Sequence, residues 1–156
     1  MKLTLILTGK TKSGYLLEGV DDYLKRIRRY APLSVETIPD LKVSRKMNTE
    51  EVKKQEGKQI LQRLKPADHV ILLDERGKRF SSEAFALYLQ GLEGRTGQTV
   101  FVVGGAYGFS EEVYDRCDQK ISLSDMTFSH QMVRLVFSEQ LYRAYTILNG
   151  EPYHHK

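Results

Sequence analysis

The sequence predicts a single α/β domain, residues 1–156, with a mainly parallel sheet and helices on both faces. Five short runs of aliphatic and β-branched residues alternate with segments of helical periodicity. The chain of 156 residues can bury one substantial core but is too short for two comfortable domains. The third run, HVILLD, is almost continuously apolar, which is typical of a parallel strand that is buried on both faces.

The first half of the chain is expected to contain two strands and two helices. In KLTLILT (2–8), polar and aliphatic residues alternate as in a strand. Apolar residues then recur at helical spacing over 14–27, and LSVETI (33–38) is a second strand. A second helix is expected over 48–64, because its first residue is an asparagine that forms a capping-box pattern with Glu51.

The second half is expected to add three strands and two shorter helices before a long final one. HVILLD (69–74) is the third strand and TVFVVGG (99–105) the fourth. Serines precede two helical segments, over 82–92 and 110–117, and are expected to cap them. KISLS (120–124) is a brief fifth strand.

The final helix, expected over 129–149 and ended by Gly150, is apolar on more than one face. Such a helix is either deeply buried or shared between the core and a partner. Closed two-fold dimers are the commonest oligomers, so we expect a homodimer. The apolar positions are Met132, Val133, Leu135, Val136, Phe137, Leu141, Tyr142, Tyr145, Ile147 and Leu148.

Positive charge is concentrated in the first part of the chain. Residues 1–65 contain 15 Lys and Arg with 8 Asp and Glu, whereas residues 66–156 contain 9 and 12. The basic residues gather in YLKRIRRY (23–30) and LKVSRK (41–46). Composition allows either a solvated helix end and loop or a surface for a polyanion, of which nucleic acid is the commonest.

Several classes of protein are disfavoured by composition. No run approaches the roughly 18 apolar residues of a membrane helix, and the N-terminal stretch has no secretory cleavage site. The single cysteine, Cys117, excludes an internal disulfide and suits a reducing compartment, so we expect a cytoplasmic protein. The four histidines and Cys117 show no zinc-type spacing, and no metal is expected.

Two strand ends are candidate ligand-binding elements, because ligands of open α/β sheets sit beyond the carboxyl ends of the strands. They are LLDERG (72–77) and the glycine-rich VVGGAYGFSEE (102–112). The glycines do not have the Rossmann spacing, no Walker lysine follows them, and two glutamates at 111 and 112 would oppose a phosphate. A tight turn that needs glycine only for its backbone is the alternative.

Two arginines of the final helix differ in their local partners. Arg143 follows Glu139 by four residues, the favourable order for an ion pair. Arg134 has no acid at helical spacing, so its partner must come from elsewhere. A ligand, an RNA phosphate or the other subunit could supply one.

Three segments considered together resemble a known family. They are KLTLILTGK (2–10), VVGGAYGFS (102–110) and LSDMTFSHQMVRLVFSEQLYRAYTILNGEPYHHK (123–156). From end to end, the chain resembles the ribosomal RNA large-subunit methyltransferase H family of the SPOUT superfamily. The resemblance implies methyl transfer from S-adenosylmethionine to N3 of a pseudouridine in 23S rRNA, on the assembled ribosome, by a homodimer. It also implies a trefoil knot near the C-terminus.

The resemblance also implies the cofactor site. Ser129 stands where the family usually has proline, and its hydroxyl can cap the final helix instead. The implied cofactor contacts lie in loops at strand ends. They are Leu73, Gly104, Leu123, Ser124, Asp125, Met126, Thr127 and Phe128.

The last residues, LNGEPYHHK (148–156), are a candidate for the substrate side of the site. A pseudouridine N3 becomes nucleophilic only when its proton leaves, so a base and a cation beside it would help. We expect His154 to take part in proton transfer, Arg143 or Arg134 to stabilise the developing anion, and Tyr153 to stack on or bind the base. The expected RNA-binding residues are Lys25, Arg26, Arg28, Arg29 and Arg134.

Three other functions remain open at this point. Another SPOUT enzyme could modify tRNA or a different base. A ribosome-associated RNA-binding factor without catalysis would share the basic surface but would not bind S-adenosylmethionine saturably. A nucleotide-dependent oxidoreductase would carry nicotinamide or flavin.

Overall fold

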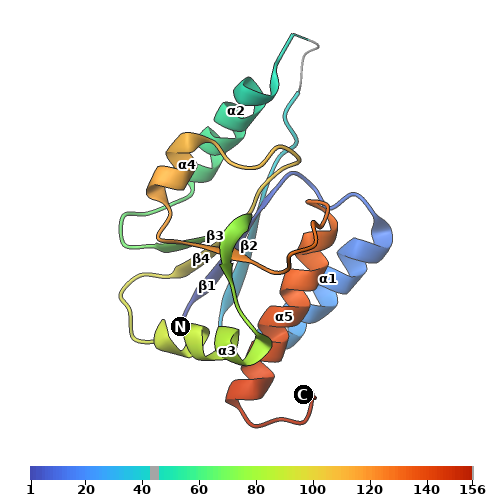
Figure 1. The fold of residues 1–156 in the computed structure, drawn as a ribbon, viewed down its shortest axis with the longest axis vertical. Coiled ribbons are helices and arrows are strands. Elements are labelled where there is room, and N and C mark those ends of the chain that lie inside the picture. The colour runs from blue at the N-terminus through green and yellow to red at the C-terminus, as the bar shows by residue number, and fades with distance from the viewer. Residues whose placement is uncertain (43–45, 156) are drawn as a thin grey trace.

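The computed structural model describes residues 1–42 and 46–155 and shows one five-stranded, wholly parallel sheet (Figure 1). The strand order is β2-β1-β4-β3-β5, and helices cover both faces, which confirms the predicted fold class. The strands are β1 (Leu3–Thr8), β2 (Leu33–Ile38), β3 (His69–Arg79), β4 (Thr99–Val103) and β5 (Gln119–Ser122).

Alternate residues of the strands pack into two separate cores. Leu5 and its neighbours on one face pack against helices α1, α3 and α5, whereas Ile6 on the other face belongs to the core under α2 and α4. The helices are α1 (Gly14–Ile27), α2 (Thr49–Gln62), α3 (Ser82–Gly91), α4 (Glu111–Arg116) and α5 (Met132–Leu148). None of these helices is long and apolar enough to cross a membrane.

The helix starts follow the predicted caps. The Asn48 side chain accepts a hydrogen bond from the Glu51 amide at 2.9 Å, and the Ser81 hydroxyl accepts one from the Ala84 amide at 3.1 Å. The Ser110 hydroxyl likewise caps α4. Each cap satisfies an amide that the helix itself leaves without an acceptor.

Ser129 caps the segment before α5, as expected for the residue that replaces proline. Its hydroxyl accepts a hydrogen bond from the Met132 amide at 3.1 Å, and its carbonyl accepts one from the Val133 amide at 3.0 Å. The regular helix then begins at Met132, three residues later than the sequence predicted.

Strand β3 is five residues longer than predicted. The apolar pattern ends at Asp74, but the backbone continues to pair with β5 after a register shift between Leu73 and Lys78. Gly77 allows this approach, because a Cβ there would lie 2.5 Å from the Ile121 amide nitrogen. Hydrophobic periodicity therefore marked where the core ends and not where the strand ends.

Arg134 contradicts the prediction that it binds RNA. Its side chain is 0% exposed, and its guanidinium donates to the carbonyls of Thr8 at 2.8 Å and Gly9 at 2.9 Å and to the Thr11 hydroxyl at 2.9 Å. Backbone dipoles at the end of β1 are thus the missing partner, and burial lowers the pKa of this guanidinium. The prediction was wrong because backbone acceptors leave no trace in side-chain spacing.

Replacing Arg134 by lysine should destabilise the fold strongly. Lysine keeps the charge but not the planar fork of donors, so buried carbonyls would lose their partners and cost about 3 kcal/mol of unfolding free energy. Chemical denaturation would measure this. Arg29→Lys, at an exposed position, is the control and should change the unfolding free energy by less than about 0.5 kcal/mol. Equal stability of the two variants would contradict this account of Arg134.

Candidate active site

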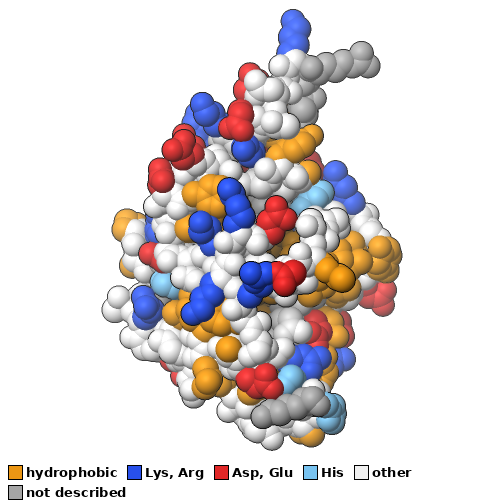
Figure 2. All heavy atoms as spheres, viewed as in Figure 1, with side chains coloured by type: hydrophobic (Ala, Val, Ile, Leu, Met, Phe, Trp, Pro, Cys, Tyr) orange, Lys and Arg blue, Asp and Glu red, His pale blue; other side chains and the backbone are white. Residues whose placement is uncertain are grey.

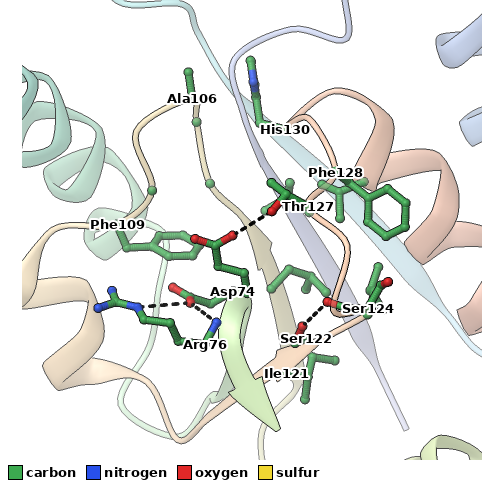
Figure 3. A pocket seen from close by; sticks show the side chains of 18 of the residues that line it. Asp74, Arg76, Ala106, Phe109, Ile121, Ser122, Ser124, Thr127, Phe128 and His130 are labelled. Carbon is green, nitrogen blue, oxygen red and sulfur yellow. Dashed lines mark hydrogen bonds and ion pairs between the residues drawn. The ribbon is translucent and has the colours of Figure 1, made fainter. Parts of the chain in front are cut away.

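A pocket of about 350 Å³ lies at the carboxyl ends of β4 and β5, beside residues 73–76 of β3, where the apolar part of that strand ends (Figure 3). The ends of parallel strands meet at one edge of a sheet, which is why residues distant in sequence gather there. Seven of the eight residues predicted to contact the cofactor line this pocket. They are Leu73, Gly104, Leu123, Ser124, Met126, Thr127 and Phe128.

The glycine-rich turn forms one wall of the pocket. Its residues 105 and 108 form an antiparallel bridge, with the Gly108 amide donating to the Gly105 carbonyl at 3.2 Å. Gly108 has φ of +85°, which favours glycine. At Gly104 a Cβ would lie 3.1 Å from the Phe109 ring, so a larger residue would crowd the wall.

Loop 123–128 forms the facing wall, and side chains attach it to β3. Asp125, which does not line the pocket, is ion-paired with Arg79. The Thr127 hydroxyl donates to Glu75 Oε2 at 3.3 Å. Within the loop, the Ser124 hydroxyl accepts a hydrogen bond from the Met126 amide at 2.9 Å. The loop is therefore held at both ends, while the Met126 side chain is 79% exposed.

A polar network where the apolar part of β3 ends was missed as a set of site residues. Asp74 accepts hydrogen bonds from the Arg76 amide at 2.8 Å and from the Tyr114 hydroxyl. The Arg76 guanidinium also donates to the Tyr114 hydroxyl at 2.9 Å. Burial, followed by the Asp74 hydrogen bond, raises the pKa of Tyr114. An acid at the end of a buried strand was the available sequence signal.

His130 lies at the pocket opposite Ala106 (Figure 3). Burial lowers the pKa of His130, and the positive charges of Arg134 and Lys12 lower it further. A neutral imidazole therefore faces the pocket at neutral pH.

The three residues predicted to be catalytic form one cluster. Arg143 is ion-paired with Glu139, as the spacing of four residues predicted. The Tyr153 hydroxyl donates to Glu139 Oε1 at 3.0 Å, and the Arg143 guanidinium lies over the Tyr153 ring at 4.7 Å. His154 Nδ1 lies 3.2 Å from Arg143 Nη1, and its Nε2 lies 2.9 Å from Glu83 Oε1.

These contacts determine the hydrogen-bonding roles within the cluster. A guanidinium only donates, so His154 Nδ1 accepts and Nε2 carries the proton that is donated to Glu83. Burial raises the pKa of Tyr153, and hydrogen bonds with Tyr23 and Glu139 raise it further, so its phenol stays protonated. Histidine and acidic side chains gather near the C-terminal end of the chain (Figure 2). These contacts attach Tyr153 to α5 and His154 to α3.

The cluster is not beside the pocket of its own chain. Val133 lines the pocket near the start of α5, whereas Arg143 is ten residues further along this helix. That spacing corresponds to about 15 Å along the helix axis. Within one chain, the residues predicted to be catalytic therefore lie far from the loops predicted to bind the cofactor.

The basic end of α1 adjoins the tail cluster. Arg26 is ion-paired with Asp22 at 3.3 Å, and its guanidinium lies 5.6 Å from the Tyr142 ring centre. Tyr142 in turn packs edge-on against Tyr153 at 4.8 Å. The remaining basic residues of this segment, Lys25, Arg28 and Arg29, are exposed. The second basic stretch, LKVSRK (41–46), falls partly outside the described residues.

The described residues contain no group of three or more His, Cys, Asp or Glu side chains arranged to hold a metal ion. The lining of the pocket combines apolar and polar side chains in about equal measure.

Comparison with known proteins identifies the family of the chain. Residues 1–154 match the family described as "Predicted SPOUT methyltransferase". A protein of Parabacteroides distasonis is 51% identical over 157 residues and one of Porphyromonas gingivalis 49% over 158, and each alignment covers 100% of both chains. A protein of Christiangramia forsetii is 51% identical over 161 residues, with the same coverage. All three are named ribosomal RNA large subunit methyltransferase H. The fold, the strand-end pocket and this full-length similarity show that the chain belongs to the SPOUT methyltransferase family.

Proposed function

We propose that the protein transfers a methyl group from S-adenosylmethionine to N3 of a pseudouridine in 23S rRNA on the assembled ribosome. The observation that carries this proposal is the strand-end pocket between the glycine turn and loop 123–128, in a chain about half identical to proteins named for rRNA methylation. Such a substrate would place the enzyme in the cytoplasm.

The pocket suits S-adenosylmethionine in shape and chemistry. Its volume of about 350 Å³ lies within the usual range for small ligands. Glycine at 104 and 105 lets this wall pack closely, because a Cβ at 104 would crowd the Phe109 ring and a Cβ at 105 would meet the Glu56 carboxyl. Leu73, Leu123 and Phe109 supply apolar surface for an adenine ring. Once bound, the cofactor would supply a methyl group on a positively charged sulfur.

We infer a two-fold dimer in which each tail completes the partner's pocket. The separation of about 15 Å between Val133 and Arg143 along α5 supports this, because one chain cannot bring its own cluster to its own pocket. A closed dimer would create two equivalent composite sites. The basic end of α1, which packs beside the tail, would then lie where rRNA enters.

In such a site the tail cluster can move a proton and stabilise an anion. Removal of the N3 proton leaves negative charge on the base, and Arg143 is the nearest cation within the cluster. If Arg143 turns from His154 Nδ1 toward the base, the imidazole gains a free acceptor for the N3 proton. The same movement delivers a guanidinium to the imide anion. The protonated Tyr153 phenol can pack on the base or donate to a base carbonyl.

A C-terminal trefoil knot is also part of the proposal. The chain between β5 and α5 is attached to the extended part of β3 by the Arg79–Asp125 ion pair and the Thr127–Glu75 hydrogen bond. Helix α5 then packs between α1 and α3. These contacts support a threaded segment, because such a segment must lie against the loop that encloses it.

Alanine at Tyr153 or His154 should reduce methyl transfer by at least about 100-fold without weakening cofactor binding. The assay is transfer of labelled methyl to ribosomes that lack the modification, with cofactor affinity measured by calorimetry. His155→Ala, at the exposed neighbouring position, is the matched control and should stay active. Full activity of both variants would contradict the role of the tail. Absence of saturable S-adenosylmethionine binding would favour a non-catalytic RNA-binding factor.

Two inactive variants should restore activity when they form a mixed dimer. Gly104→Val would crowd the pocket against Phe109, and a chain ending at Gly150 would lack the tail. In a mixed dimer one site has both an intact pocket and an intact partner tail. Random pairing should therefore recover about one quarter of the native activity. Co-expression with two different affinity tags would measure it, and no recovery would argue against a shared site.

A further inference from the structure

Glu56 lies directly behind the glycine wall of the pocket. It belongs to α2, and its carboxyl contacts Gly105, where a Cβ would be 2.6 Å from Oε2 and 2.9 Å from Oε1. The next residue, Gly57, packs equally closely, since a Cβ there would lie 2.3 Å from the Ser110 hydroxyl oxygen. Gly57 in α2 and Gly105 in the glycine turn thus allow α2 and the pocket wall to pack closely.

The Glu56 carboxyl has a buried oxygen without a partner. Among the residues that the structure describes, Oε1 is shielded from solvent and accepts no hydrogen bond. The acids that line the pocket are different, because Asp74 is bound by Arg76 and Tyr114, and Glu75 accepts from Thr127. Buried oxygens of this kind are rare and usually have a functional reason.

The surroundings of Glu56 make its negative charge costly unless a cation approaches. Burial raises the pKa of Glu56, and the negative charge of Asp40 raises it further. A positive charge on the other side of Gly105 would favour the ionised carboxylate. The attraction would act through the thickness of one residue, from a half-buried carboxyl whose Oε1 is shielded from solvent.

We propose that Glu56 is a specificity residue that makes the pocket prefer the cationic cofactor over its neutral product. This inference rests on the proposed use of S-adenosylmethionine. The sulfur of that cofactor carries a positive charge, which S-adenosylhomocysteine loses when the methyl group leaves. A carboxylate behind Gly105 therefore stabilises the reactant complex more than the product complex. Product release is favoured by the same charge.

Glu56→Gln tests this with three ligands measured by calorimetry on the full chain. Glutamine keeps the shape and removes the charge. Affinity for S-adenosylmethionine should fall by about tenfold, and so should affinity for sinefungin, which carries an ammonium group at the corresponding position. Affinity for S-adenosylhomocysteine should change by less than about twofold. Glu56→Asp keeps the charge and should retain part of the preference.

Glu51→Gln is the matched control, because it makes the same charge change at an exposed position of α2. It should leave all three affinities unchanged. Equal weakening of all three ligands by Glu56→Gln would indicate a packing role and overturn the inference, and so would unchanged affinities. Binding of none of the ligands by the native chain would overturn the proposed function, and this inference with it.

Discussion

The buried guanidinium of Arg134 connects the first strand of the sheet to the last helix, and the position of the pocket depends on this connection. It binds the carbonyls of Thr8 and Gly9 where β1 ends, and also the carbonyl of His130 at 3.2 Å. The same few hydrogen bonds therefore attach the start of α5 to the end of β1. A buried cation is costly, but carbonyl dipoles on several sides compensate it, and the negative charge of Asp40 also favours the charged guanidinium. The positive charge of Arg134 thus lies inside the protein, between β1 and α5, and not at the surface.

The two ends of α5 serve different purposes. Near its start, His130 and Val133 line the pocket, and near its end Arg143 organises the tail. A rigid helix keeps these two regions about 15 Å apart, which no side-chain movement can close. The proposed dimer would overcome this separation, because two-fold symmetry can bring the start of one helix to the end of another without a longer chain.

The acidic side chains on the two sides of the glycine wall differ in their hydrogen bonding. Inside the pocket, the Asp74 carboxylate accepts hydrogen bonds from the Arg76 amide and the Tyr114 hydroxyl, and Arg76 also donates to Tyr114. Behind the wall, Glu56 keeps an oxygen without a partner. In the proposed role of Glu56, the unpaired carboxylate would favour a cationic ligand in the pocket. Glycine is the residue that allows the second arrangement, because any side chain at 105 would displace the carboxyl.

The sequence alone determined the elements, their caps and the residues of the pocket. Strand periodicity, the caps at Asn48 and Ser110, and the hydroxyl of Ser129 were all confirmed, because they depend on neighbours within a few residues. Seven of the eight residues that the family resemblance predicted to contact the cofactor lie together at one pocket, since strand ends of a parallel sheet meet at one edge, and their role in cofactor binding stays a prediction.

Only the tertiary structure decided the rest. It showed that Arg134 is buried against backbone carbonyls, that β3 continues past its apolar residues, and that the tail lies far from its own pocket. It also brought Glu56 against Gly105 across 49 positions of sequence. These features depend on backbone acceptors, on strand pairing and on distances along a helix. The spacing of side chains in the sequence does not predict any of them.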